Sequence, residues 1–366
     1  MTKLAHLYNK GEAGAQTLLY SYSMDKASHL VFSPAYNTDL PAFGLNKPFA
    51  LDRGELVLKA LTDEFGTTPS VISPQPLDIE DVLLVHSLAY LESLEKEETW
   101  FEIFELKADD LKRETATKAL PELIEDFLLK SGGTLQAARL ALKHGLAANL
   151  GAGYHHAFPD QGRGFCVIND IAITIRKLQK EKQIKTAMIV DLDFHQGDGT
   201  AKTFSGDKSV FTLSVHSQEG WPDIKQESSL DVAILEAEKD TYLERTKAAV
   251  NQALNQFTPD LVMFVAGSDV YEKDILPGTK YLRLPLSVLK ERDQFVIDTF
   301  KKREIPLAMV FAGGYGPHVW EVHHQAVRHL LLASGTEYAL NSELASDSEH
   351  PSKLDSSGIK CSATNN

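Results

Sequence analysis

Three polar residues at alternating positions offer the clearest chemistry in this sequence. Asp191, Asp193 and His195 follow the apolar run 187–190, which is typical of a strand buried on both faces of a parallel sheet. Because side chains alternate along a strand, the three project together from its carboxyl end. Neighbouring carboxylates repel each other unless a proton or a cation separates them. Carboxylate oxygen and imidazole nitrogen both suit zinc, so the spacing predicts a metal site, and the alternative is a strand end that caps the next helix.

Other predicted strands also end in polar or glycine-rich segments. These segments are His155-His156, Gly267-Ser268-Asp269 and Gly313-Gly314-Tyr315. Ligands bind at the carboxyl ends of the strands in open parallel sheets, so we expect all of them at one edge. Asp269 then becomes the third ligand beside Asp193 and His195. Three protein ligands leave a zinc position open, as in catalytic sites.

The remaining polar residues suggest catalytic roles. Histidines need partners that fix their tautomers, and Asp191 and Asp198 are the available carboxylates for His155 and His156. Tyr315 follows two glycines that let the backbone fold closely, which suits an inward-facing phenol that donates to an oxyanion. Taken singly, the histidines are also typical of a polar loop and the tyrosine of a turn. Their combination beside a metal site favours catalysis.

The segments that must position these residues alternate between strand and helix patterns. Strands are predicted at 30–32, 147–156, 187–192, 210–215, 261–266 and 307–311. Helices are predicted at 51–65, 135–146 (after Gly132-Gly133), 169–182, 199–205, 239–257, 287–302 and 317–332, with a proline-rich linker at 69–76. This alternation predicts a mostly parallel sheet with helices on both faces. We expect an N-terminal segment 1–27, one α/β catalytic domain 28–335 and a disordered polar tail 336–366.

Composition narrows the class of protein and of partner. The 366 residues carry a formal net charge of −14, which argues against nucleic acid or an anionic membrane as the main partner. Two cysteines, Cys166 and Cys361, cannot form a disulfide framework, so a reducing compartment is expected. Neither a signal-peptide pattern nor an apolar run of membrane-spanning length is found. A cytoplasmic protein is predicted.

Five motifs occur in order between about residues 30 and 332. They are Gly153-Tyr-His155-His156, Gly164-Phe165-Cys166-Val-Ile-Asn169-Asp170, Asp191-Leu-Asp193-Phe-His195-Gln-Gly-Asp198-Gly, Ala266-Gly-Ser-Asp269 and Gly313-Gly314-Tyr315. This set resembles the zinc-dependent histone deacetylase family, including its bacterial members. Two further segments, 43–49 and His195-Gln196-Gly197, are most similar to the class IV branch and its bacterial relatives.

The resemblance implies a fold, cofactors and site residues. The fold is the three-layer arginase/deacetylase fold, an α/β domain with a central, mostly parallel sheet. Zn²⁺ would bind Asp193, His195 and Asp269. A structural K⁺ would use Asp191, Asp193, His195, Ser214 and Val215. Substrate would contact Gly164, Phe165, Trp221, Gly313 and Gly314, with the rings of Phe165 and Trp221 as facing walls of an acyl-lysine tunnel.

The expected activity is removal of acetyl or longer fatty acyl groups from lysine side chains of peptides or proteins. His156 with Asp198 would take the proton of the attacking water and later protonate the leaving amine. His155, oriented by Asp191, would supply positive charge, and Tyr315 would donate to the oxyanion.

Two departures from the family pattern concern the tunnel rim rather than the metal ligands. Lys273 stands where relatives usually have glycine, and Asn46-Lys47 replaces a histidine-containing turn. The nearest alternative substrate is a small acetylated amine such as a polyamine. Dimanganese hydrolysis of the arginase type needs further metal ligands, and a non-catalytic acyl-lysine reader would not need every catalytic residue.

Overall fold

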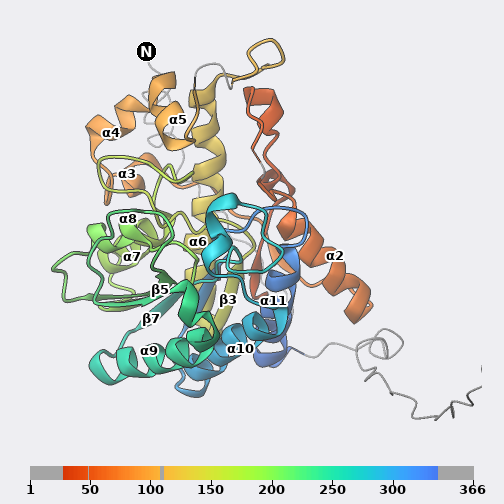
Figure 1. Cartoon of the computed structure of the whole chain (residues 1–366), viewed down its shortest axis with the longest axis vertical. Helices are drawn as coiled ribbons and strands as arrows, with labels where there is room; N and C mark the ends of the chain where they lie inside the picture. The colour runs from red at the N-terminus through yellow and green to blue at the C-terminus, as the bar shows by residue number, and fades with distance from the viewer. Residues whose placement is uncertain (1–27, 48, 108–110, 337–366) are drawn as a thin grey trace, which may run out of the picture.

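The computed structural model describes residues 28–47, 49–107 and 111–336. Its strands form an eight-stranded sheet in the order β2-β1-β3-β8-β7-β4-β5-β6, and every neighbouring pair is parallel (Figure 1). The strands are β1 Leu30–Val31, β2 Val71–Ile72, β3 Leu146–Asn149, β4 Ala187–Asp191, β5 Val210–Ser217, β6 Leu230–Ile234, β7 Leu261–Val265 and β8 Leu307–Val310. Since β7 and β8 insert between β3 and β4, the four strands that precede the expected site residues lie side by side.

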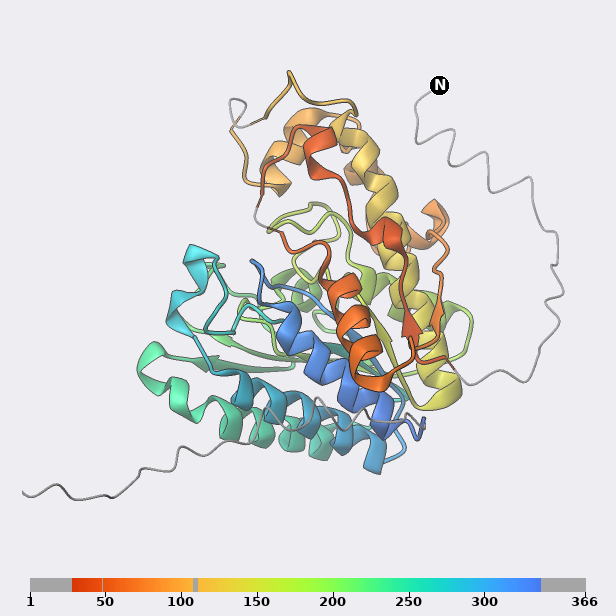
Figure 2. The ribbon, with the colours of Figure 1, turned by 90° about the vertical axis from the view of Figure 1, so that its right-hand side faces the viewer.

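Helices cover both faces of this sheet. They are α2 Arg53–Phe65, α3 Ile79–Val82, α4 Leu88–Ser93, α5 Glu97–Ile103, α6 Ile124–His144, α7 Asp170–Lys180, α8 Asp198–Thr203, α9 Tyr242–Gln256, α10 Leu286–Lys302 and α11 Trp320–Ala333. Figure 2 shows α2, α9, α10 and α11 together on one side. Along β4, Met188 and Val190 pack in their core, whereas Ala187 and Ile189 pack in the core that contains α6 and α7. The predicted three-layer α/β arrangement is confirmed.

Helix α6 connects the sheet to a further group of helices. Its last residue, His144, leads through Gly145 directly into β3, while its first half lies beside α3, α4 and α5, away from the sheet (Figure 1). Because β3 starts at the C-terminal end of α6, the N-terminal half of the helix extends past the carboxyl edge of the sheet. This group of helices can therefore form walls around a site at that edge.

The predicted start of this helix, at Leu135, is wrong by eleven residues, since α6 begins at Ile124. Gly132 and Gly133 were expected just before this helix. Both lie inside α6, where a Cβ on Gly132 would collide with the backbone of Gln75 and one on Gly133 with the hydroxyl of Tyr36. They permit close packing instead of ending the helix.

Other differences concern short or exposed strands. The segment interpreted as a proline-rich linker contains β2. The segment between β5 and α9, where no strand was predicted, contains β6, whose residues are mostly half-buried or exposed. The strand predicted at 147–156 ends at Asn149, so the two histidines lie in a loop. The predicted N-terminal segment 1–27 and nearly all of the predicted tail lie outside the described residues. None of the described helices is long and apolar enough to cross a membrane.

Candidate active site

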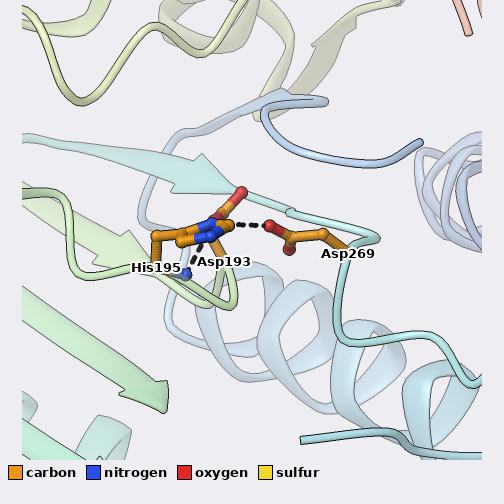
Figure 3. Close-up of side chains that lie close together, drawn as sticks. All are labelled: Asp193, His195 and Asp269. Atoms are coloured by element: carbon orange, nitrogen blue, oxygen red, sulfur yellow. Dashed lines mark hydrogen bonds and ion pairs between the residues drawn. The ribbon is translucent and has the colours of Figure 1, made fainter. Parts of the chain in front are cut away.

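Asp193, His195 and Asp269 meet at the carboxyl edge of the sheet. Nδ1 of His195 lies 2.9 Å from Oδ2 of Asp269 and 3.3 Å from Oδ1 of Asp193 (Figure 3). One ligand atom from each residue lies within 4.8 Å of the others, and all three residues are buried. Two carboxylates and an imidazole nitrogen that converge in this way form a cluster able to hold a divalent cation.

The strand register brings these residues together. Asp191 ends β4 opposite Val265 of β7, so the segments that follow these two strands leave the sheet at the same level. Asp193 therefore faces the loop that contains Asp269. A Cβ on Gly267 would collide with Asp193, which explains the glycine there. Arg292 of α10 donates to the carbonyl oxygens of Leu192 at 3.1 Å and Gly267 at 3.0 Å. This buried arginine ties the two strand ends to each other.

The electrostatics of the cluster favour positive charge among its carboxylates. Burial and the neighbouring charge of Asp193 raise the pKa of Asp269 to about 6. Burial alone would lower the pKa of His195, but the carboxylates of Asp193 and Asp269 outweigh it and raise that pKa to about 9. Protons thus partly compensate the buried negative charge that a metal ion would neutralise.

Each of the two adjacent histidines has its own carboxylate. Nδ1 of His155 lies 2.7 Å from Oδ2 of Asp191, and Nδ1 of His156 lies 2.7 Å from Oδ1 of Asp198. Asp170 holds the loop in front of them by accepting the backbone N–H groups of residues 153 and 154 at 3.1 and 2.6 Å. With Nδ1 engaged, Nε2 of each ring is left for chemistry, and Nε2 of His155 lies 3.7 Å from Oδ1 of Asp193.

The two rings differ in protonation although their centroids are only 4.0 Å apart. For His155, burial is outweighed by the carboxylates of Asp191 and Asp193, which raise its pKa to about 10. For His156, burial and the adjacent charge on His155 lower the pKa to about 4 despite Asp198. At neutral pH one ring is a cation and the other a neutral base, which separates an electrostatic role from a proton-accepting one.

Tyr315 lines the same cavity as Asp193 and His195. Its backbone N–H donates to Oδ2 of Asp274 at 2.7 Å. Arg53 of α2 donates to the carbonyl oxygens of Ala312 at 2.6 Å and Gly313 at 3.3 Å. The backbone around Tyr315 is therefore held from two sides. Burial raises the pKa of the Tyr315 hydroxyl well above the ordinary value, so the hydroxyl stays protonated and can donate a hydrogen bond.

Aromatic rings surround the cluster of Asp193, His195 and Asp269, which we call the metal cluster; the rings of Phe49, Phe165 and Tyr315 line the cavity, and Trp221 is not among its lining residues. Phe165 lies 5.0 Å from Phe49 and 6.1 Å from Tyr315 between ring centroids. The ring of Trp221 packs edge-to-face on His156 at 4.7 Å. A Cβ on Gly164 would touch the Trp221 ring at 2.8 Å, so this glycine allows the ring to approach. The facing-wall role of Trp221 stays a prediction.

The residues expected to bind potassium lie around the ends of two neighbouring strands. Asp191 of β4 is the register partner of Ser214 of β5, and Val215 follows it. The hydroxyl of Ser214 shares a hydrogen bond of 2.9 Å with Nδ1 of His216. The potassium site stays a prediction.

Arg53, Asp274 and Arg292 were missed by the sequence reasoning. Arg53 and Asp274 hold the backbone around Tyr315, and Arg292 fixes the strand ends. Asp274 could have been suspected, since it is a carboxylate five residues after a predicted ligand. The two arginines belong to amphipathic helices, where an arginine is usually solvated, and no local signal marked them. Cys166 is buried with a pKa raised by that burial, as expected of a packed thiol rather than a nucleophile.

Comparison with known proteins identifies the family. The model of the histone deacetylase domain matches residues 47–331. The chain belongs to the histone deacetylase family. It is 30% identical over 305 residues to Histone deacetylase 2 of Arabidopsis thaliana, which covers 81% of this chain and 77% of that protein. It is 27% identical over 309 residues to the acetoin utilization protein AcuC of Staphylococcus aureus, covering 78% and 76%. An uncharacterised protein of Picosynechococcus is 40% identical over 211 residues, 57% of this chain and 68% of that protein.

Solved structures agree on the fold. The HD domain of HDA15 matches with a TM-score of 0.63 at 18% identity, over 84% of this chain and 92% of that one. An acetylpolyamine aminohydrolase from Burkholderia pseudomallei matches with a TM-score of 0.59 at 19% identity, over 83% and 98%. The arginase/deacetylase fold is thereby shown, and this chain is a hydrolase of the deacetylase family.

Proposed function

We propose that this protein is a zinc-dependent hydrolase that removes acyl groups from lysine side chains of proteins. One observation supports this most strongly. Two carboxylates and an imidazole converge beside two histidine–carboxylate pairs, all within reach of a cavity that Tyr315 also lines. This set contains a cation site, a base, a fixed positive charge and a phenol donor, which are the parts that amide hydrolysis needs.

The ligand set fits one zinc ion. Two carboxylate oxygens and a ring nitrogen lie within 4.8 Å of one another in buried positions, and three protein ligands leave a position open. When bound, zinc would polarise the amide carbonyl and lower the pKa of a water molecule. Among the described residues only this group gathers metal-ligating side chains, which argues against a dimanganese centre of the arginase type. We keep potassium at Asp191, Asp193, His195, Ser214 and Val215 as part of the proposal.

The residues of the chain divide the remaining work. His156 is neutral, so its Nε2 accepts the proton of the attacking water and later returns it to the leaving amine, while Asp198 fixes the ring. His155 stays charged beside Asp191 and stabilises negative charge on the tetrahedral intermediate. Tyr315 donates a hydrogen bond to the oxyanion.

Positive charge beside the rings of Phe165 and Trp221 favours lysine side chains of proteins over polyamines. The ammonium of Lys47 lies 5.5 Å from the ring centroid of Phe165. The guanidinium of Arg163 lies 4.5 Å from the ring centroid of Trp221 and 3.3 Å from Asp198. A polyamine remains cationic along its length after acetylation and would be repelled here, whereas a peptide can present neutral or acidic neighbours.

The test is hydrolysis of lysine peptides that carry acetyl through myristoyl groups, with acetylated spermidine in parallel and zinc-loaded Tyr315→Phe as the control. We expect peptide hydrolysis that falls about 10²–10³-fold in Tyr315→Phe, as for loss of one oxyanion donor. A chain-length maximum then identifies the acyl preference. Activity on acetylated spermidine alone would assign the small-amine function instead, and full activity of Tyr315→Phe would remove the phenol from the mechanism.

A further inference from the structure

The cavity of the active site is lined by a second group of residues besides those around the metal cluster. Its lining includes His156, Phe165 and 312–314, and also segments far from the metal ligands in sequence. We define the inner chamber by the lining residues Tyr36, Thr38, Leu40, Leu123, Phe127 and Lys130. Most of these side chains are aliphatic or aromatic, and one, Lys130, carries a full charge. If the carbonyl group of a bound acyl-lysine lies at the metal cluster, the rest of its acyl chain would extend into this space.

Lys130 is a buried cation that contacts no carboxylate directly. It lies in α6, is only 8% exposed and uses one of its three N–H donors on the hydroxyl of Thr38 at 2.7 Å. Asp126, one turn earlier on α6, also hydrogen-bonds Thr38 and attracts the ammonium electrostatically from beyond ion-pair distance. Among the described residues, no carboxylate oxygen lies within 4.0 Å of the ammonium. Two donors therefore remain for a ligand in the chamber.

The second cation of the cavity is already engaged. Arg53 donates to the carbonyl oxygens of Ala312 and Gly313, so its role is to hold backbone.

Burial, together with the positive charge of Arg53, lowers the pKa of Lys130 to about 8 even though Asp126 opposes this. Near neutral pH the amine still carries its proton for most of the time. A buried charge of this kind is costly unless an anion pairs with it.

We propose that Lys130 makes the inner chamber a carboxylate-binding subsite. The proposal rests on the acyl-lysine hydrolase function. Its ligand is the carboxylate at the far end of an acid-tailed acyl group such as succinyl or glutaryl. In the reaction the amide C–N bond breaks, the water oxygen forms the new C–O bond, and both water protons end on the leaving amine, the first of them through His156.

The first arm of the test compares substrates matched in length. Lysine peptides carry succinyl or butyryl, and glutaryl or pentanoyl, and kcat/KM is measured for each. We expect wild-type protein to favour the acid-tailed member, and Lys130→Met to lower that ratio about 10- to 100-fold, as for loss of a charged hydrogen bond. Lys130→Arg should restore most of the ratio because it keeps the charge.

The second arm tests the released acid through inhibition of wild-type zinc-loaded protein by acetate. An inhibition constant that rises about tenfold or more in Lys130→Met, with an unchanged acid-tailed to neutral ratio, would overturn the proposal, because Lys130 would then act on the released acid only. The matched control is Lys143→Met, an exposed lysine on the same helix, which should alter neither quantity.

The outcomes separate this proposal from the function on which it rests. If wild-type protein hydrolyses no acyl-lysine peptide at all, the proposed function fails. If it hydrolyses acetyl-lysine but Lys130→Met changes neither the ratio nor the inhibition by acetate, only the carboxylate subsite is refuted. Should Lys130→Met fail to fold, wild-type protein decides, because indifference to both acid tails and acetate refutes the subsite by itself.

Discussion

The metal cluster and the inner chamber are two ends of one cavity, and they are built in opposite ways. The metal cluster takes two of its candidate ligands from a stretch of three residues, 193–195, and the third from the loop after the neighbouring strand β7. The inner chamber combines the segment 36–40 with residues 123–130 around the start of α6. Strand pairing fixes the cluster, whereas helix packing fixes the chamber.

The difference in construction suggests that the cluster carries out the reaction and the chamber selects the acyl group. In the cluster, backbone groups hold the ligands directly, since Gly313 donates to Oδ2 of Asp193 at 2.8 Å and Phe194 donates to Oδ1 of Asp269 at 2.9 Å. In the chamber, side chains hold one another, as in the hydrogen bond of 2.7 Å from Lys130 to Thr38. A side chain held by another side chain can be exchanged without disturbing the sheet. The chamber is therefore the part where substrate range can change while the reaction stays the same.

Asp269→Asn should produce the largest effect at the cluster. The amide keeps the size of the side chain and an acceptor for the Phe194 N–H, but it removes the charge that faces His195 at 2.9 Å. We expect loss of bound zinc and of hydrolysis to background, beyond the roughly 10–100-fold typical of partners that only contact a ligand. Zinc content by atomic emission checks this, with the exposed Asp240→Asn as control.

Retention of one zinc per chain by Asp269→Asn would contradict the ligand assignment. Retention of zinc by Lys130→Met, in contrast, is what the comparison requires, because the ammonium belongs to the chamber and not to the cluster.

The cluster was predictable from sequence because its signal is local. Asp193 and His195 follow a short buried run at a spacing of two, and a second buried run leads to Asp269, so the rule for parallel sheets brings them together. The pairing of each histidine with its own aspartate was likewise found as predicted. In both cases one simple periodicity places the side chains.

The chamber was not predictable because its signal is not local. Lys130 is one of 37 Lys and Arg residues, and only the packing of α6 against the segment around Thr38 makes it a cavity residue. Gly132 and Gly133 carried a signal that was misinterpreted, since a helix-weakening pair can also mark a close approach between backbones. Distinguishing the two meanings requires the partner segments, Gln75 and Tyr36, which lie more than fifty residues away in sequence.

The two adjacent histidines test the catalytic roles assigned beside the metal cluster. His156→Ala should lower kcat by about 10²–10⁴-fold, since it removes the neutral base whose pKa lies at about 4. His155→Ala should lower it less, because it removes charge stabilisation but leaves the base and Asp198 in place. Steady-state kinetics of both zinc-loaded variants test this order. A larger loss in His155→Ala would exchange the two roles.

Gly133→Ala tests the chamber wall and should have the smallest effect. Alanine is intrinsically better than glycine in a helix by up to about 1 kcal/mol, but the new Cβ collides with the Tyr36 hydroxyl, which is fixed by its hydrogen bond of 2.8 Å to Asn149. Overpacking of this kind costs about 1–3 kcal/mol, so we expect a net loss in the free energy of unfolding. Denaturant unfolding measures it, and Gly278→Ala is the control, since a Cβ there meets nothing within 4 Å.

Gly133→Ala also separates the two ends of the cavity within one protein. Tyr36 lines the chamber, so its displacement should reduce hydrolysis of long acyl groups more than that of acetyl-lysine, while zinc content stays at the wild-type level. If zinc were lost together with long-chain activity, the cluster and the chamber would form one mechanical unit. The sheet and the helices would then not have separate roles in chemistry and acyl-group selection. Strain introduced on α6 would have reached the ends of β7 and β4 through β3 and β8, which lie between α6 and those strands in the sheet order.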